Sequence, residues 1–177
     1  MKTKNQTLLA IDPGTTESGW AWFAKDGTIQ AHGISLNHSL WKELPESLWY
    51  EVASPRVAIE MIASYGMPVG KEVFETCVWI GRYVAHFGVP NCRKVYRRQV
   101  KSELCGSPRA KDSNIRQAIL DRYPPTGGGK TPQIGTKAQP GPLYGVKSHI
   151  FAAIGVGITA RAHWDELETF GDGGTDL

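Results

Sequence analysis

The chain has 177 residues, of which 41% are hydrophobic and 21% are charged, and its formal net charge is +3. This composition predicts one compact globular domain and excludes a disordered chain, and the lack of any run of roughly 18 uncharged apolar residues excludes a membrane-spanning helix. Because the first residues lead directly into a predicted strand and not into a signal peptide, we expect a soluble cytoplasmic protein that uses no membrane.

Three short segments near the amino terminus have the composition of β-strands. Residues 6–12, 17–24 and 28–35 are rich in β-branched or aromatic side chains, and Pro-Gly and Asp-Gly turns separate them. Turn residues at these intervals are typical of hairpin connections. We therefore expect a three-stranded antiparallel meander.

Helical and strand-like segments alternate in the remainder of the chain. In chain order they are a helix-like stretch interrupted by Pro45 at 37–54, a strand at 56–62, a helix at 69–87, a strand at 93–98 that continues into a short basic helix to Leu104, a helix at 110–124 and a last helix at 145–164. The last helix has a small-residue face that predicts close packing on the sheet: Ala152, Ala153, Gly155 and Gly157. A meander followed by this alternation predicts an α/β fold, with a mixed five-stranded sheet flanked by helices.

Residues 124–143 form the longest segment without a predicted helix or strand. They contain five Pro, five Gly and two Lys. Loops of this length inside a compact domain are usually functional or disordered. We therefore expect a mobile loop between the last two helices.

The charged residues are unevenly distributed. Residues 164–177 contain five acidic residues and no Lys or Arg, so residues 1–163 carry all 20 basic residues and 12 of the 17 acidic ones, a net charge of +8. A basic body favours a polyanionic partner, because each Lys or Arg placed against a phosphate releases condensed counterions. The same charge also occurs in proteins that bind no nucleic acid. We expect one domain over residues 1–166 and a flexible acidic tail over residues 167–177.

The cysteines argue against a zinc site. Cys77, Cys92 and Cys105 are an odd number of cysteines, and no two of them have C-x-x-C spacing. This pattern predicts free thiols in a reducing compartment.

Asp12, Glu60 and His149 are the candidate metal ligands. Asp12 ends the first predicted strand, where open α/β sheets place ligands, although Asp-Pro-Gly is also ordinary turn chemistry. Glu60 stands inside the apolar run VAIEMI, and a buried carboxylate is costly unless it is paired or metal-bound; the alternative is a strand end that faces solvent. His149 stands near the start of the last helix, where a lone His is often only a surface residue. If Asp12 and Glu60 project side by side, their oxygens suit Mg²⁺ or Mn²⁺.

Four segments in register carry a resemblance to a known family. They are LLAIDPGTTESGWA, RVAIEMIASYG, RAKDSNIRQAIL and GPLYGVKSHIFAAIGVGITA, and they span nearly the whole chain. In this order they resemble the motifs of RuvC-like Holliday junction resolvases, particularly the phage-type members, within the RNase H-like superfamily. The resemblance implies that residues 1–166 are an RNase H-like nuclease domain, acting as a homodimer on branched DNA in the cytoplasm of a bacterial or phage-infected cell.

The resemblance also assigns catalytic and metal-binding roles. Asp12 would be the first metal carboxylate, Glu60 the second, and His149 would replace a C-terminal helix acid, as it does in some members. Ala152 stands where bacterial members often have a further Asp, so the fourth ligand is not identified, and Ser148 is a candidate to help through a water. Two Mg²⁺ or Mn²⁺ ions about 4 Å apart would bind the scissile phosphate, and in-line displacement would give 5′-phosphate and 3′-hydroxyl ends. Because His149 is neutral as a ligand, we expect Mn²⁺ to support turnover better than Mg²⁺.

Basic residues gather in three places along the chain. The groups are Arg93, Lys94, Arg97, Arg98 and Lys101; Arg109, Lys111 and Arg116; and Lys130, Lys137 and Lys147. The predicted DNA-binding residues are Lys111, Arg97, Arg98, Lys101, Arg116, Lys147 and Tyr65. Lys111 comes first because it lies in a resolvase motif, although any one of these cations can equally belong to a solvated helix face. Tyr65 is either a core or turn aromatic or a ring that stacks on an unpaired base.

The helix predicted at 69–87 follows Glu60, where the family has its dimerisation helix. Its apolar residues Val73, Cys77, Ile80 and Val84 face either the sheet or a twofold partner. A homodimer makes physical sense, because cutting two symmetric strands needs two sites related by a dyad.

Other functional classes fit parts of the sequence. Asp-x-Gly-Thr-Thr is also the first phosphate motif of actin-like and sugar-kinase-like ATP-binding domains, but that fold normally needs two RNase H-like domains. The segment TGGGKT (126–131) lacks the spacing of a P-loop and follows no clear strand. A branched-DNA-binding module that does not cut is the remaining alternative, and Ala152 with the missing fourth acid is its only support.

Overall fold

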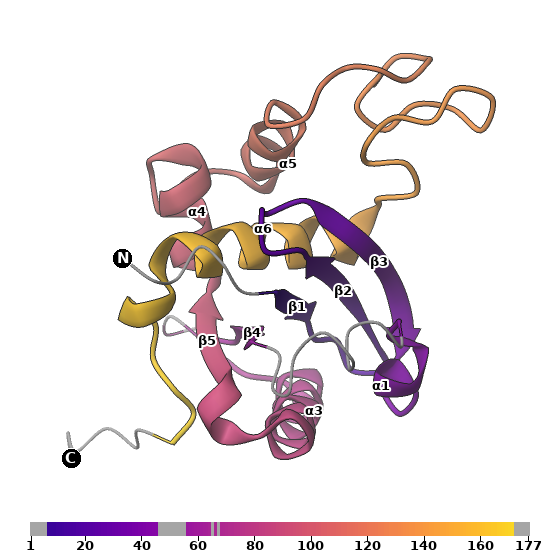
Figure 1. Ribbon diagram of the computed structural model, residues 1–177. Helices are drawn as coiled ribbons and strands as arrows, with labels where there is room; N and C mark the ends of the chain where they lie inside the picture. Colours follow the sequence, from indigo (N-terminus) through magenta and orange to yellow (C-terminus); the bar gives the residue numbers. More distant parts are fainter. Residues whose placement is uncertain (1–6, 46–55, 65, 67, 172–177) are drawn as a thin grey trace.

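The computed structural model describes residues 7–45, 56–64, 66 and 68–171 and has one five-stranded sheet at its centre (Figure 1). The strands are β1 (Leu8–Asp12), β2 (Glu17–Phe23), β3 (Ile29–Leu36), β4 (Arg56–Met61) and β5 (Cys92–Tyr96). Their order is β3-β2-β1-β4-β5. The first three strands pair antiparallel, whereas β4 and β5 run parallel to β1. The predicted α/β fold with a mixed five-stranded sheet is therefore confirmed.

Helices cover both faces of this sheet. They are α1 (Leu40–Glu43), α3 (Lys71–Phe87), α4 (Arg97–Cys105), α5 (Asp112–Leu120) and α6 (Ser148–His163), with 3₁₀ turns η1 (Val89–Asn91) and η2 (Trp164–Glu166). In Figure 1, α6 crosses one face and α3 lies on the other. Leu8 and Ala10 of β1 belong to the core under α6, and Leu9 and Ile11 belong to the core over α3. A sheet covered on both faces requires this continuous run of apolar residues.

Small residues allow α6 to lie close to the sheet. Ala153 is fully buried, and a Cβ added to Gly157 would lie 2.1 Å from the ring of Phe23 on β2. A Cβ added to Gly155 would instead lie 2.9 Å from Val100 of α4. The predicted packing on the sheet is confirmed for Gly157, whereas Gly155 faces a helix.

The apolar residues of α3 divide between the core and the surface. Ile80 and Val84 are buried in the core over α3, so they face the sheet. Phe74 and Val78, one helical turn apart, are 61% and 55% exposed. The exposed apolar surface of α3 is therefore made by Phe74 and Val78 and not by the buried pair.

Two predicted strand and helix limits are wrong. The strand predicted at 93–98 ends at Tyr96, because the Tyr96 N–H donates a 2.8 Å hydrogen bond to Oε1 of Gln99 and so starts α4 at Arg97. The last helix begins at Ser148 and not near Gly145, since Lys147 has an extended backbone with a φ of −150° and a ψ of 164°.

Two predicted helices are shorter in the structure. Within the described part of 37–54, only the single turn of α1 forms, and it ends before Pro45; residues 46–55 lie outside the described residues. The helix predicted at 110–124 is α5, which ends at Leu120. α1 ends as expected before a proline, since Leu44, the residue before Pro45, has an extended backbone, whereas α5 ends four residues before Pro124.

The segment between α5 and α6 folds back on itself. The Gly127 N–H donates to the carbonyl of Pro132 at 2.8 Å, and the Gly141 N–H donates to the carbonyl of Ile134 at 2.9 Å. A Cβ on Gly141 would lie 2.3 Å from the Pro132 carbonyl oxygen, so the crossing requires glycine. In Figure 1 this segment extends away from the sheet. The mobility predicted for residues 124–143 stays a prediction.

Residues 167–171 lie along the edge of β5. Leu167 is buried, and the Lys94 N–H donates to the carbonyl of Glu168 at 2.9 Å. Residues 172–177 lie outside the described part of the chain. The domain limit and the flexible tail therefore stay predictions.

The three thiols are free. Cys92 is buried, and Cys77 and Cys105 are partly buried, with no disulfide among them, as predicted. Among the residues that the structure describes, no helix is long and apolar enough to cross a membrane.

Candidate active site

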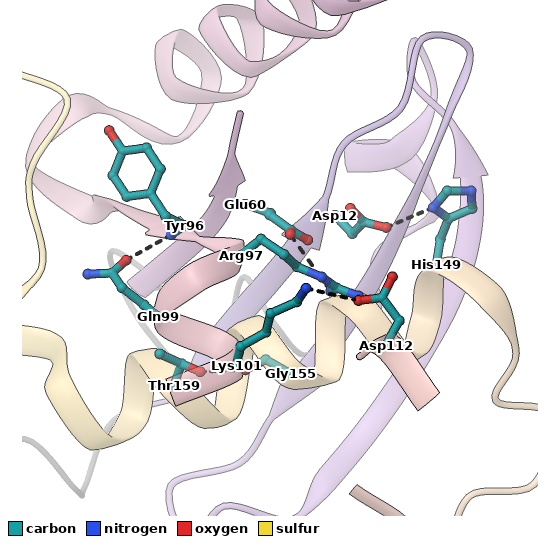
Figure 2. A network of polar contacts seen from close by, with 10 residues as sticks. All are labelled: Asp12, Glu60, Tyr96, Arg97, Gln99, Lys101, Asp112, His149, Gly155 and Thr159. Carbon is teal, nitrogen blue, oxygen red and sulfur yellow. Dashed lines mark hydrogen bonds and ion pairs between the residues drawn. The ribbon is translucent and has the colours of Figure 1, made fainter. Parts of the chain in front are cut away.

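Asp12 and Glu60 lie side by side at the carboxyl ends of β1 and β4. These strands are parallel neighbours in which Ile11 pairs with Ile59, so the following residues reach the same edge of the sheet. Their side chains are only 15% and 14% exposed. Figure 2 shows the two carboxylates next to each other. The structure thus brings together the two acids that the sequence pointed to.

The Glu60 carboxyl has a strongly perturbed pKa. Burial and the negative charge of Asp12 raise it from 4.5 to about 8, and a hydrogen bond with Asp12 acts in the same direction. The charge of Arg97 opposes this shift. Two adjacent carboxylates are stable when they share a proton or bind a cation. The pair is therefore short of positive charge, which a divalent cation would supply.

His149 contacts Asp12 from the first turn of α6. Its Nδ1 atom lies 2.7 Å from Oδ2 of Asp12, and half of its side chain is exposed. Gly19 of β2 pairs with Asp12, and a Cβ on Gly19 would lie 2.4 Å from the His149 carbonyl oxygen. Glycine at this position lets the start of α6 approach the sheet closely enough for the imidazole to reach Asp12.

Ser148 introduces backbone strain next to His149. Its φ is 37°, and it is the one non-glycine residue with a positive φ in the described ranges. This conformation costs on the order of 1–3 kcal/mol and is concentrated at functional sites. The strain marks the turn that leads into α6 beside Asp12.

A buried polar network holds the loop that follows Asp12. The hydroxyls of Ser18 and Tyr83 donate to Oδ1 of Asn37 at 2.7 and 3.0 Å, and all three residues are buried. The Asn37 amide in turn donates to the carbonyl of Gly14 at 2.9 Å. Since these bonds link β2, the end of β3 and α3 to the Asp12 loop, they fix the position from which Asp12 projects.

The donor atoms of the three candidate ligands meet in pairs. Asp12 contacts both Glu60 and His149. No group of three or more His, Cys, Asp or Glu side chains in the described part of the chain is gathered closely enough to hold an ion. Two carboxylates and an imidazole suit Mn²⁺ or Mg²⁺ by their chemistry, and one ion bound by all three requires side-chain rotation, which the exposed His149 ring permits.

The three residues open into a pocket of about 610 Å³ with cationic walls. Its lining residues are Asp12, Glu60, Arg97, Asp112, Ile115, Arg116, Val146, Lys147, Ser148, His149, Phe151 and Ala152. The Arg116 guanidinium lies 4.8 Å from the centre of the Phe151 ring. Ala152 faces this pocket with no acidic group, so the fourth ligand remains unassigned.

A second pocket of about 430 Å³ carries only cationic charge. Its lining residues are Arg97, Arg98, Lys101, Pro108 and Arg109. Arg97 lines both pockets. Together the pockets contain five of the predicted DNA-binding residues: Arg97, Arg98, Lys101, Arg116 and Lys147.

The other predicted cations lie elsewhere. Lys111 is exposed next to Asp112 and lines neither of these two pockets. Lys130 and Lys137 are exposed on the loop that extends from the sheet. Tyr65 lies outside the described residues.

The grouping of Arg93 and Lys94 with Arg97 is wrong. Arg93 lies over the Trp164 ring at 5.0 Å, and Lys94 lies 3.6 Å from Glu168. Arg93 and Lys94 are the second and third residues of β5, whereas Arg97 follows its carboxyl end, where the pockets lie. Their partners, Trp164 and Glu168, line neither of the two pockets.

Asp112 is the site residue that the sequence reasoning missed. Oδ1 of Asp112 lies 3.0 Å from Nη2 of Arg97 and 3.8 Å from Nζ of Lys101. One signal was available, since Asp112 is an acid inside the basic motif RAKDSN. Ser18, Asn37 and Tyr83 carried no comparable signal, because such residues are common in any fold.

The glycine-rich segment 126–131 has no P-loop context. It follows α5 and lies in the irregular segment before α6, whereas a P-loop joins a strand to a helix. The prediction that this segment follows no strand is confirmed.

No family model matches the sequence, and no curated protein matches it. In structure the chain is similar to Thermus thermophilus RuvC, with a TM-score of 0.61 and 17% sequence identity over 93% of this chain and 99% of the RuvC chain. T. thermophilus RuvC in complex with a Holliday junction substrate gives the same TM-score, identity and coverage. The protein therefore has the fold of RuvC, a mixed-sheet fold of the RNase H-like type.

Proposed function

We propose that this protein is a metal-dependent endonuclease that cuts branched DNA, with Holliday junctions as substrate and DNA recombination or repair as its role. The observation that carries the proposal is the contact of Asp12 with both Glu60 and His149, inside a pocket walled by cationic side chains. The RuvC fold, and a RuvC structure that contains a Holliday junction substrate, support the substrate class.

Asp12, Glu60 and His149 are the residues that hold Mg²⁺ or Mn²⁺ in this proposal, with two ions at each site. A bound divalent cation supplies the charge that activates water and stabilises the leaving 3′ oxygen, which gives 5′-phosphate and 3′-hydroxyl ends. Asp12 and Glu60 contribute the oxygens, and His149, whose Nδ1 atom lies 2.7 Å from Oδ2 of Asp12, contributes a ring nitrogen. The Glu60 proton must leave before a metal binds, because carboxylate ligands are deprotonated.

The cations of the two pockets bind the DNA backbone. Arg97, Arg116 and Lys147 surround the candidate metal ligands, and Arg98 and Lys101 line the pocket beyond Arg97. The first set suits the scissile phosphate, and the second suits its neighbours along the strand. Because each phosphate contact releases counterions, junction affinity is expected to fall steeply with salt.

The proposed active form is a homodimer. Phe74 and Val78 expose apolar surface on α3, and Val69 just before this helix is also 43% exposed. Adjacent exposed apolar residues favour a protein contact. A symmetric pairing through α3 would give two active sites related by a dyad, as the two cuts of a junction require.

The rival functions have weaker support. A non-cleaving junction-binding module is favoured by Ala152 and by the pairwise arrangement of the donor atoms. The ATP-binding alternative needs free backbone N–H groups after Asp12, but the Gly14 N–H points to Oγ of Ser18 at 3.4 Å. The ATP-binding fold also normally needs two RNase H-like domains, whereas the described residues form one five-stranded sheet.

The test is cleavage of a labelled immobile four-way junction compared with a linear duplex of matched sequence. The reactions contain Mg²⁺, Mn²⁺ or EDTA, and the proteins are wild type, Asp12→Asn and a control, Asp26→Asn. Asp26 is an exposed acid of the β2–β3 turn that accepts a hydrogen bond from Thr28. The control changes the same residue type away from the pocket.

Symmetric nicking of the junction that requires a metal and disappears only in Asp12→Asn supports the nuclease. Junction binding without cleavage in either metal supports the binding module. ATP binding without DNA binding supports the kinase-like alternative.

A further inference from the structure

Asp112 is an acidic residue at the active-site pocket to which the proposed metal and DNA contacts assign no role. It is the first residue of α5, its side chain is 71% exposed, and it lines the same pocket as Asp12 and Glu60. An exposed carboxylate beside a phosphate-binding pocket repels the substrate. A further interaction is needed to account for this acid.

The Arg97 guanidinium lies between two carboxylates at unequal distances. Its Nη2 atom lies 3.0 Å from Oδ1 of Asp112, which is a hydrogen-bond distance, whereas its Nη1 atom lies 3.8 Å from Oε1 of Glu60, which is not. Figure 2 shows Arg97 placed between the two acids. Lys101 adds a second cation 3.8 Å from the same Asp112 oxygen. Arg97 is therefore hydrogen-bonded to Asp112, whereas its ion pair with Glu60 is looser and includes no hydrogen bond.

Arg97 would move onto Glu60 if Asp112 did not hold it. A guanidinium and a carboxylate pair best through two parallel hydrogen bonds. Glu60 is mostly buried and adjacent to Asp12, so its surroundings attract a cation strongly. A two-bond pair would occupy both Glu60 oxygens, which are the atoms that a metal needs.

We propose that Asp112 is a positioning residue that holds Arg97 off Glu60 and so keeps the Glu60 oxygens available to a metal ion. This role rests on the proposed function, because it requires Asp12 and Glu60 to be metal ligands. Held in this way, Arg97 remains a lining residue of both pockets, where it would be available to a phosphate.

Two simpler roles for Asp112 have to be separated from this one. An acid in the first turn of α5 is favoured by the helix dipole. A negative charge near the site also attracts a cation through space. Neither of these roles depends on Arg97, so a double-mutant cycle distinguishes them from the proposed role.

The experiment is calorimetric titration of the metal-free full chain with Mn²⁺ in the absence of DNA. The proteins are wild type, Asp112→Asn, Arg97→Gln and the double variant. Asp121→Asn is the matched control, since Asp121 is the acid at the other end of α5 and accepts a hydrogen bond from Gln117. Asp112→Glu keeps the carboxylate and is the conservative variant.

We expect Asp112→Asn to weaken Mn²⁺ binding about tenfold, the size of effect seen between coupled neighbours. In the Arg97→Gln background the same change should alter the affinity less than about twofold, because no guanidinium is left to move. Asp112→Glu should recover most of the affinity, and Asp121→Asn should bind as wild type does.

An equal loss in both backgrounds would overturn the proposal in favour of a through-space charge effect, and wild-type affinity in Asp112→Asn would overturn it outright. The Asp12→Asn variant tests the metal site separately from the role of Asp112. If wild type binds Mn²⁺, Asp12→Asn does not, and Asp112→Asn binds normally, the metal site stands and the role of Asp112 fails. If wild type binds no Mn²⁺, both fail.

Discussion

The Nδ1 atom of His149 lies 2.7 Å from Oδ2 of Asp12, so the first turn of α6 contacts the last residue of β1. This contact joins two residues separated by 137 positions in the sequence. It sets the direction in which the Asp12 carboxylate points. Because His149 is also a proposed metal ligand, the preference of the site for one metal over another should depend on the imidazole.

Replacing His149 by Asp should change the metal preference of cleavage. Imidazole nitrogen suits Mn²⁺ better than Mg²⁺, whereas a carboxylate suits both. We expect wild type to cut faster with Mn²⁺, and the ratio of the Mn²⁺ rate to the Mg²⁺ rate to fall about tenfold in His149→Asp, the size of effect typical around metal ligands. The exposed His38 gives the control His38→Asp. Equal rates with both ions in wild type would contradict this expectation.

The pH dependence of stability should report the Glu60 carboxyl in the metal-free protein. Its pKa is raised from 4.5 to about 8, so the folded state holds this proton more tightly than the unfolded state does. The stabilising contribution is complete below pH 4.5 and is lost as the pH rises toward 8. Glu60→Gln keeps a neutral side chain, and its Tm at pH 8 in EDTA should exceed that of wild type by roughly 3–6 °C.

Thermal unfolding between pH 5 and pH 8.5 measures this difference. Glu17→Gln is the control, because Glu17 is an exposed carboxylate on β2. If wild type and Glu60→Gln lose stability in parallel across this range, the carboxyl is not perturbed as described. Mn²⁺ added at pH 8 should raise the Tm of wild type and leave Glu60→Gln nearly unchanged.

The close packing of α6 on β2 should make one glycine irreplaceable. Gly157→Ala places a methyl group 2.1 Å from the Phe23 ring, so the free energy of unfolding should fall by about 1–3 kcal/mol. Gly81→Ala is a matched control within α3, where an added Cβ meets nothing within 4 Å, and it should stabilise by about 0.5–1 kcal/mol. Urea denaturation measures both. Equal effects of the two substitutions would show that α6 relaxes away from the sheet.

Loss of the Tyr83 hydroxyl should loosen the loop that follows Asp12. Tyr83→Phe removes the bond to Oδ1 of Asn37 and the 2.9 Å contact with Ser18 inside a buried network. We expect a loss of about 1 kcal/mol in unfolding free energy, with a severalfold slower junction cleavage. The exposed Tyr144 provides the control Tyr144→Phe for stability. Unchanged stability in Tyr83→Phe would mean that water replaces the hydroxyl.

A charge placed on α3 should separate the proposed homodimer. Phe74→Glu combined with Val78→Glu puts two acids on the exposed apolar surface, so a dimer built on it should dissociate. Light scattering after size exclusion should give twice the chain mass for wild type and the chain mass for the variant. Leu36→Glu changes an exposed apolar residue on β3 and should remain dimeric. If wild type is a monomer at micromolar concentration, the proposed homodimer through α3 is wrong.

Local sequence patterns predicted several features of the fold and of the site. Turn residues between β-rich segments predicted the meander, and an acid within the apolar run of β4 identified Glu60, because a carboxylate rarely enters such a run without a partner. Asp12 was marked by its place at a strand end. These signals are local: each depends on a residue and its few neighbours in the chain.

The sequence by itself determined the order of strands and helices and the two acids at the ends of β1 and β4, since hydrophobic periodicity and strand-end position are properties of short segments. Only the tertiary structure decided which distant side chains meet. Three such contacts are the hydrogen bond between Asp112 and Arg97, the contact of His149 with Asp12, and the ion pair that joins Lys94 to Glu168. Such contacts arise from packing and side-chain direction, which no local pattern specifies.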